Sequence, residues 1–196
     1  MIPVVAIVAP GNMGSAVGRR LTENGVRVLT TLSGRGAASV ARANAAGMTD
    51  VPLDRLTEAE IVLSILPPAH ALSFAEQMAP LLLAAERKPV FVDCNAVSPE
   101  TVRRIGAVVA GTGAPFVDAS IIGLAPKPGQ ASPHIYVCGE SAARVLVLGE
   151  YGLDVRVLDG AVGAASALKM SYAGINKGVA ALASAMILAE IGRAHV

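Results

Sequence analysis

Short apolar runs rich in valine and isoleucine alternate along the chain with longer stretches rich in alanine. The runs have four to six residues, which is the length of a buried strand, and several are apolar at every position. Strands that are apolar on both faces are typical of a parallel sheet covered by helices on either side. The predicted strands are residues 4–8, 26–30, 61–65, 90–93, 116–119, 135–138 and 155–158.

The stretches between these runs predict the covering helices. Examples with helical character are residues 15–24, 37–46 and 99–110. From Leu168 to Ala189, apolar residues recur at alternating steps of four and three, which predicts a long helix over residues 163–191. Such a helix would extend on the order of 45 Å. The sequence therefore predicts an α/β fold, a Rossmann-like doubly wound parallel sheet followed by a long helix.

Composition narrows the class of protein. Of the 196 residues, 53% are hydrophobic and 16% are charged, so the chain is apolar enough to fold around a core. The formal net charge of +1 disfavours nucleic acid and anionic membranes as partners. Cys94 and Cys138 lie far apart without metal-ligand spacing, so no disulfide framework or zinc site is predicted, and a reducing cytoplasm fits best.

A membrane segment is a rival interpretation, because residues 1–18 carry no charge. Pro3, Pro10 and three glycines interrupt that stretch, and no positive region precedes it as in a secretory signal. Two later charge-free windows, residues 61–75 and 178–189, are shorter than a bilayer requires. We therefore expect a soluble cytoplasmic protein without a membrane partner.

The strongest chemical signal follows the first predicted strand and has the sequence Gly11-Asn12-Met13-Gly14. In a dinucleotide-binding turn, glycine lets the backbone approach the pyrophosphate, and the N–H groups at the start of the next helix stabilise the negative charge. Ala9 stands in the place of the first glycine of G-x-G-x-x-G, so two of the three glycines are present. The segment predicts a dinucleotide site. The alternative is a turn that needs glycine only for packing.

The end of the second predicted strand bears on the choice of cofactor. An acidic residue there accepts hydrogen bonds from the ribose 2′-hydroxyl of NAD, but residues 28–35 contain none. Ser33 and Arg35 instead offer a hydroxyl and a guanidinium, which suit the 2′-phosphate of NADP. NADP is therefore predicted over NAD. The alternative interpretation of Arg35 is a solvated loop charge.

Five segments follow one another in order: the glycine turn ending in Met-Gly, Leu66-Pro67-Pro68, and residues 93–99, 118–124 and 163–169. Together they resemble the 6-phosphogluconate dehydrogenase and 3-hydroxyisobutyrate dehydrogenase (β-hydroxyacid dehydrogenase) superfamily over nearly the whole chain. The pattern looks closest to a 6-phosphogluconate-dehydrogenase-like branch. The family adds an all-helical domain after the Rossmann domain, so the resemblance implies a Rossmann domain over residues 1–160 and the first helix of that second domain over residues 161–196.

The resemblance also implies functional residues. It places the catalytic acid or base at Lys169. It places the substrate at Ser120, Ile121 and Gly123. It places the cofactor, together with the glycine turn, at Leu66, Pro67, Pro68 and Asn95.

Departures from the family pattern leave the substrate open. Ile122 and Leu124 stand where the family often has serine and glycine for a carboxylate. Tyr172 and Ala173 stand where it commonly has asparagines. The expected substrate is therefore a hydroxy acid, a phosphorylated sugar acid or a related small molecule.

Lys169 is also a candidate on its own chemistry, because it borders the apolar seam of the long helix. A lysine that loses solvation there has a lowered pKa and exchanges a proton with a substrate hydroxyl more readily. The alternative is a lysine whose stem covers apolar surface while its ammonium reaches water. Metal chemistry is not predicted, because His70, His134 and His195 share no ligand spacing.

The long helix raises the question of what covers it, because residues 178–189 would be exposed. A C-terminally truncated chain, a fragment or an obligate homo-oligomer, such as a dimer through this helix, would each explain the exposure. The function expected first is that of an NADP-dependent oxidoreductase. The alternatives are an NADP-binding protein without complete catalytic machinery, or an imine reductase, a class that commonly has Asp or Tyr where Lys169 stands.

Overall fold

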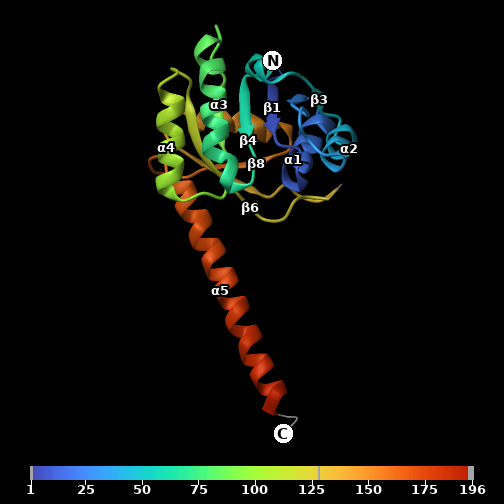
Figure 1. Ribbon diagram of the computed structural model, residues 1–196, viewed down its shortest axis with the longest axis vertical. Helices are drawn as coiled ribbons and strands as arrows, with labels where there is room; N and C mark the ends of the chain where they lie inside the picture. Colours follow the sequence, from blue (N-terminus) through green and yellow to red (C-terminus); the bar gives the residue numbers. More distant parts are fainter. Residues whose placement is uncertain (1, 128, 194–196) are drawn as a thin grey trace.

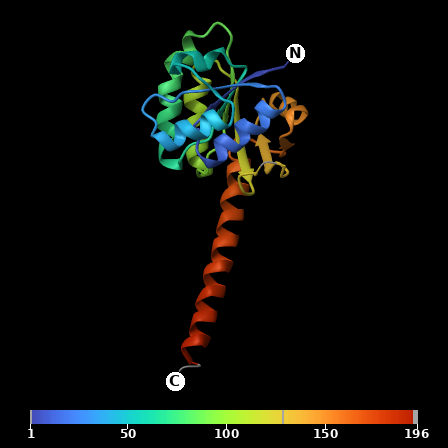
Figure 2. The ribbon, with the colours of Figure 1, turned by 90° about the vertical axis from the view of Figure 1, so that its right-hand side faces the viewer.

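The computed structural model describes residues 2–127 and 129–193, which form one eight-stranded sheet, helices on both of its faces, and a helix that projects from it (Figure 1, Figure 2). The strands are β1 (Val4–Val8), β2 (Arg27–Thr30), β3 (Thr49–Asp50), β4 (Ile61–Ser64), β5 (Val90–Asp93), β6 (Phe116–Ile122), β7 (His134–Cys138) and β8 (Asp154–Val157). The α-helices are α1 (Asn12–Glu23), α2 (Ala37–Ala45), α3 (Ala71–Ala84), α4 (Pro99–Ala110) and α5 (Ala164–Arg193). The 3₁₀ segments are η1 (Leu53–Glu58), η2 (Pro68–His70) and η3 (Ala142–Tyr151).

The order of the strands indicates where in the sheet a ligand binds. They lie side by side as β3-β2-β1-β4-β5-β6-β7-β8, and β1 to β6 run parallel to one another. This is the order of a dinucleotide-binding fold, in which the chain winds outward from β1 in both directions. The predicted Rossmann-like α/β class is confirmed. Ligands of such folds bind where the order reverses, at the carboxyl ends of β1 and β4.

Two details differ from the sequence-based expectation. Each of the seven predicted strands forms, but β3 was missed because it has two residues, both exposed, and therefore no apolar run. The sheet is also not parallel throughout, because β7 runs antiparallel to β6. A parallel return needs a crossover of a dozen or more residues, usually a helix, and the described residues between Ile122 and His134 contain no helix.

Buried side chains fill both faces of the sheet. On one face, Val17 and Leu21 of α1 pack with Leu148 of η3. On the other face, Met78 of α3 and Ile105 of α4 pack against the sheet, together with an aromatic group at its centre. In that group the ring of Phe91 lies 6.0 Å from that of Phe74 and 6.3 Å from that of Phe116. This core fixes the sheet, and with it the edge at which the parallel strands end.

Helix α5 leaves the domain at the edge opposite the N-terminus (Figure 1). Its first turn is buried against the sheet at Ala165 and Ser166, whereas every side chain of residues 174–191 is exposed. By length and composition alone, Ala164–Ile191 would suffice to cross a membrane, a test that a core helix of a soluble protein also passes. The attachment of α5 to the domain therefore lies entirely in its first turns.

Candidate functional site

The turn between β1 and α1 has the geometry of a dinucleotide-binding loop. A Cβ added at Gly14 would lie 2.0 Å from the carbonyl oxygen of Ala9, so only glycine fits against the end of β1. A Cβ added at Gly11 would have no neighbour within 4 Å, so packing explains Gly14 but does not explain Gly11. No side chain caps α1 at Gly11, and its first turn contains no acidic residue. The N–H groups of Asn12 and Met13 therefore begin a helix whose positive end is open to an anion.

The segment after β4 lies beside this turn. Ala9 donates its N–H to the carbonyl of Ile65 at 3.0 Å, which joins the ends of β1 and β4. Next in the chain, Leu66-Pro67-Pro68 leads into α3, with both prolines exposed. Asn95 is buried and serves this segment: its Oδ1 accepts the N–H of Leu66 at 2.5 Å, and its Nδ2 donates to Ser64 Oγ at 2.8 Å. The structure therefore places Asn95 as a support of the double-proline segment, with its amide already hydrogen-bonded.

A buried acid stands behind Asn95. Asp93 ends β5, and its Oδ1 accepts the N–H of Asn95 at 2.8 Å. Its Oδ2 is buried without a hydrogen-bond partner among the described residues. Burial raises the pKa of Asp93 to about 6, an effect that the hydrogen bonds from Asn95 oppose. In the sequence, Asp93 belongs to the segment 93–99 that resembles the family, and no separate role is predicted for it.

The residues predicted for the NADP 2′-phosphate are exposed in the loop after β2. Ser33 and Arg35 both face solvent there, and the N–H of Arg35 bonds to the carbonyl of Leu32 at 3.0 Å. Sequence reasoning missed Asp50, whose Oδ1 accepts the N–H of Leu32 at 2.9 Å. Asp50 lies at the end of β3, the strand that was not predicted, and it shares a hollow of about 530 Å³ with Ser33.

A second arginine reaches the glycine turn from α2. Arg42 donates its Nε to the carbonyl of Pro10 at 3.1 Å and its Nη2 to Ser39 Oγ at 3.0 Å. Its guanidinium therefore brings positive charge to the segment that precedes α1. Its place in a predicted helix after the second strand was visible in the sequence, but the direction of its side chain was not.

The predicted substrate residues follow one another along β6 and past its end. Ser120 is buried, and its hydroxyl donates to the carbonyl of Ala165 at 2.6 Å, so it contacts α5. Ile121 is also buried, and its carbonyl faces Lys169. Gly123 is exposed with φ +132, and a Cβ there would lie 3.0 Å from Pro133. Of these three, Gly123 lines an open hollow of about 480 Å³ beside α5.

Lys169 lies half-buried on the second turn of α5, at the carboxyl-terminal edge of the sheet. Its Nζ donates to the carbonyl of Ile121 at 2.5 Å. Burial lowers the pKa of Lys169, and the like charge of Lys177 adds to that effect. Because β1, β4, β5 and β6 are parallel, this edge is the one that carries the glycine turn. The fold thus brings a desolvated amine and the predicted dinucleotide turn to the same edge.

The part of the chain that the structure describes contains no group of three or more His, Cys, Asp or Glu side chains arranged to hold a metal, and His195 lies outside the described residues. Burial raises the pKa of Cys138 to about 11 and that of Cys94 well above its usual value, so both remain thiols at neutral pH.

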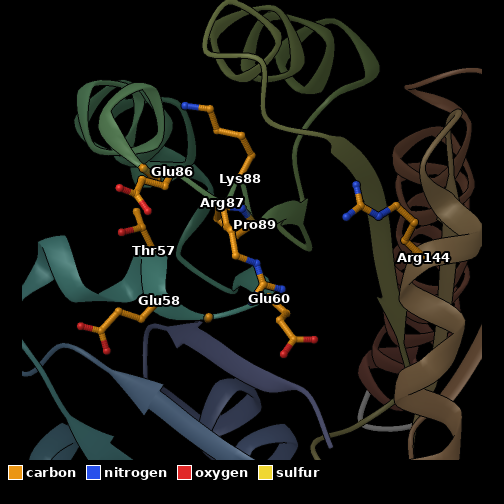
Figure 3. Close-up of a pocket in the computed structure, with 10 residues that line it drawn as sticks. Thr57, Glu58, Glu60, Glu86, Arg87, Lys88, Pro89 and Arg144 are labelled. Atoms are coloured by element: carbon orange, nitrogen blue, oxygen red, sulfur yellow. The ribbon is translucent and has the colours of Figure 1, made fainter. Parts of the chain in front are cut away.

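A charged hollow lies at the opposite, amino-terminal edge of the sheet, where β4 and β5 begin (Figure 3). Its volume is about 440 Å³, and its lining residues include Glu58, Glu60, Arg87 and Arg144. Lys88 also lines this hollow, and its Nζ donates to the carbonyls of Leu82 and Leu83 at 2.7 Å. Acidic and basic side chains surround this hollow together, so it offers no single charge to a ligand.

Residues 4–148 match the model of the NAD-binding domain of 6-phosphogluconate dehydrogenase. The chain is similar to the 3-hydroxyisobutyrate dehydrogenase of Pseudomonas aeruginosa, with 31% identity over 121 residues, 61% of this chain and 40% of that protein. It is also similar to a solved conserved protein of unknown function, described as structurally similar to 3-hydroxyacid dehydrogenases. That likeness has a TM-score of 0.80 and 31% identity, and it covers 91% of this chain and 66% of the other.

An imine reductase from Myxococcus stipitatus in complex with NADP+ shares the fold, with a TM-score of 0.74 and 19% identity over 94% of this chain and 64% of its own. A variant of that enzyme was solved with NAD+, with a TM-score of 0.76 and 19% identity over 91% of this chain and 62% of its own. This chain spans less than half the length of the dehydrogenase from P. aeruginosa. On the match over residues 4–148, the chain belongs to the 6-phosphogluconate dehydrogenase and 3-hydroxyisobutyrate dehydrogenase superfamily and contains its nicotinamide-dinucleotide-binding domain.

Proposed function

We propose that this chain is the cofactor-binding part of an NADP-dependent oxidoreductase that acts on a hydroxyl-bearing carbon of a small hydroxy acid or sugar acid. Lys169 is the general acid or base of this reaction. The observation that supports it most is the amine of Lys169, half-buried at the edge of the sheet that carries the glycine turn. A bound nicotinamide supplies the hydride chemistry.

Gly11 and Gly14 hold the pyrophosphate at the open start of α1, because no side chain or acidic residue occupies that end of the helix. The exposed Ser33 and Arg35 bind the 2′-phosphate, and no acid stands at the end of β2 to favour the 2′-hydroxyl of NAD. The carboxylate of Asp50 lies in the same region and limits this preference, because it repels a phosphate.

Lys169 takes the proton of the substrate hydroxyl in the oxidative direction and returns it in the reductive direction. A neutral amine accepts a proton, and burial, which lowers its pKa, increases the neutral fraction near neutral pH. The exposed Gly123 leaves room for the substrate beside α5. Ser120 has an indirect role, because its hydroxyl donates a hydrogen bond to the carbonyl of Ala165 in the first turn of that helix.

Replacement of Lys169 tests this role. We expect Lys169→Ala and Lys169→Arg to lower turnover about 10²- to 10⁴-fold on any hydroxy acid that the native protein oxidises with NADP+, with unchanged affinity for NADPH. Absorbance of NADPH reports turnover, and Lys127→Ala, a change of an exposed loop lysine, is the control. Turnover that survives in Lys169→Ala would overturn the role, and NADPH binding without turnover across a panel of hydroxy acids would favour a binding protein without complete machinery.

We also propose that α5 pairs with a second copy of this chain in the cytoplasm. Its exposed apolar side chains support this pairing, among them Ile175, Val179, Leu182 and Met186, each more than 60% exposed. The two free cysteines suit a reducing compartment. Light scattering after size-exclusion chromatography should give twice the mass of the chain, and a stable monomer would contradict the pairing.

A further inference from the structure

The position of Lys169 depends on how α5 is attached to the sheet. Beyond residue 173 every side chain of the helix is exposed through Ile191, so the rest of α5 does not hold it in place. Gly163 precedes the helix with φ +110 and has no side chain to cap it. The residues at which α5 begins must therefore be held by a neighbouring element.

That element is β6, through a buried carboxylate. Asp118 is fully buried and its Oδ2 accepts the N–H of Gly163 at 2.8 Å and the N–H of Ser166 at 3.2 Å. Its Oδ1 accepts the hydroxyl of Ser166 at 2.8 Å, and the thiol of Cys138 donates to Oδ2 at 3.3 Å. One carboxylate thus receives four hydrogen bonds, three of them from the start of a single helix.

These bonds have the pattern of a capping box in which the accepting side chain comes from strand β6 and not from the helix itself. In a capping box, one side chain accepts the N–H three residues into the helix, and a second accepts the N–H of the cap residue. Here Asp118 accepts both, from Ser166 and from Gly163. A carboxylate at this end of a helix is also favoured by the helix dipole. The hydroxyl of Ser120 adds a bond to the carbonyl of Ala165 at 2.6 Å.

The same strand provides the acceptor for the lysine amine. Ile121 follows Asp118 by three residues on β6, and Lys169 follows Ser166 by three residues on α5. Three residues advance about 10 Å along a strand and about 4.5 Å along a helix. The long side chain of Lys169 spans the difference between these two advances and reaches the carbonyl of Ile121. The bond between Asp118 and Ser166 fixes the helix relative to the strand, so the distance from Nζ to that carbonyl depends on this bond.

We infer that Asp118 is a positioning residue for the proposed reaction: by clamping the first turn of α5 through Gly163 and Ser166, it holds the amine of Lys169 against the carboxyl-terminal edge of the sheet. The inference rests on the proposed role of Lys169. The clamp has no contact with the reacting atoms, and it acts only through the helix. If this clamp loosens, water reaches the amine and the pKa of Lys169 rises toward the usual value of a lysine.

The test measures the titration of Lys169 directly, so it needs no substrate. The native protein and the variants Asp118→Asn and Ser166→Ala are labelled with acetic anhydride over a range of pH, and mass spectrometry of peptides reports the midpoint pH at which each lysine becomes reactive. We expect the midpoint for Lys169 to rise by about half a pH unit or more in both variants. The exposed Lys127 is the internal reference and should not move.

Two further measurements keep the result interpretable. Ser98→Ala removes a helix cap from α4 rather than α5, the bond from the Thr101 N–H at 3.1 Å, so it should leave the midpoint for Lys169 unchanged. Hydrogen exchange should show that residues 163–169 exchange at least tenfold faster in Ser166→Ala while the central strands stay protected. Ser166→Ala removes only the hydroxyl, and it serves if Asp118→Asn does not fold.

Two outcomes would overturn the inference. One is a first turn that exchanges faster while the midpoint for Lys169 stays where it is, and the other is a first turn whose exchange does not respond to either variant. Failure of the proposed function has a different signature, because a chain without turnover still reports the titration of Lys169.

Discussion

Helices α1 and α5 both begin after a glycine at the sheet, yet their first turns are in opposite electrostatic states. Helix α1 begins after Gly11 with no side-chain cap and no acidic residue in its first turn. Helix α5 begins after Gly163, and the buried carboxylate of Asp118 accepts its N–H groups. One helix thus keeps its positive end open for an external anion, and the other contains an internal anion. The difference distinguishes a proposed binding site from a structural attachment, although in the sequence each helix simply follows a glycine.

The largest expected effect comes from closing the start of α1. In Gly14→Ala the added Cβ would meet the carbonyl oxygen of Ala9 at 2.0 Å, so the backbone of the turn must shift. We expect NADPH affinity to fall on the order of a hundredfold, about 2.7 kcal/mol, and stability to fall by about 1–3 kcal/mol. Calorimetric titration and urea unfolding measure the two losses. Gly36→Ala is the matched control, because a Cβ before α2 meets nothing within 4 Å.

A smaller effect comes from giving α1 the internal anion that α5 has. A Cβ at Gly11 meets no atom within 4 Å and its backbone is extended, so Gly11→Asp fits without strain. The new carboxylate should cap the helix, raising stability by about 0.5 kcal/mol, and repel the pyrophosphate, weakening NADPH on the order of tenfold. Gly11→Asn caps without charge and should retain more of the affinity. Equal loss in both variants would show that space, not charge, matters at Gly11.

Asp93 is a buried carboxylate that has fewer hydrogen-bond donors than Asp118, so its charge lowers the stability of the folded chain. Burial raises its pKa to about 6 in the folded chain, above the usual value of an unfolded aspartate, about 3.9. Between pH 4 and 6 the folded state therefore holds a proton that the unfolded state has released, so stability falls as the pH rises through this window and is constant above it. At 1.36 kcal/mol for each unit, the fall is at most about 3 kcal/mol.

The variant Asp93→Asn isolates this effect. An amide keeps an acceptor for the N–H of Asn95 and has no charge to bury. We expect it to flatten the dependence of stability on pH and to stabilise the chain at pH 8 by about 1–2 kcal/mol. Urea unfolding at several pH values measures this, with the exposed Asp54→Asn as the control. A slope that persists in Asp93→Asn would assign it to another group.

The last prediction concerns the 2′-phosphate, which only one of the two cofactors has. Arg35→Ala should weaken NADPH about tenfold and change NADH little, because a charge-assisted bond to phosphate is worth about 1.5 kcal/mol or more. Asp50→Asn should act in the other direction and strengthen NADPH about threefold, because it removes a negative charge near Ser33. Equal weakening of both cofactors by Arg35→Ala would contradict the predicted preference for NADP.

The sequence predicts the open helix start better than the clamped one. The apolar runs of the strands and the spacing of Gly11 and Gly14 are local patterns, so the sheet and its glycine turn are visible without coordinates. The clamp is not local, because Asp118 and Ser166 are 48 residues apart and only the packing of α5 on β6 brings them together. A sequence pattern has no means to report a cap that comes from another element.

The same limit applies to Asn95 and Asp50. The sequence predicts Asn95 at the cofactor, and the structure shows its amide hydrogen-bonded to Ser64 and Leu66 at the end of β4. Asp50 was missed because β3 has two exposed residues and therefore lacks the apolar run that identifies a strand. In both cases the partner lies at or just past the end of a neighbouring strand, so the pairing of the strands decides the contact.

The most direct measurement is calorimetric titration of the native chain with NADPH and with NADH. We expect tight binding of NADPH and weaker binding of NADH, with both weakened on the order of a hundredfold in Gly14→Ala, because the open start of α1 holds the pyrophosphate common to both. No binding of either dinucleotide by a folded chain would contradict the central claim that the glycine turn at Gly11 and Gly14 is a cofactor site.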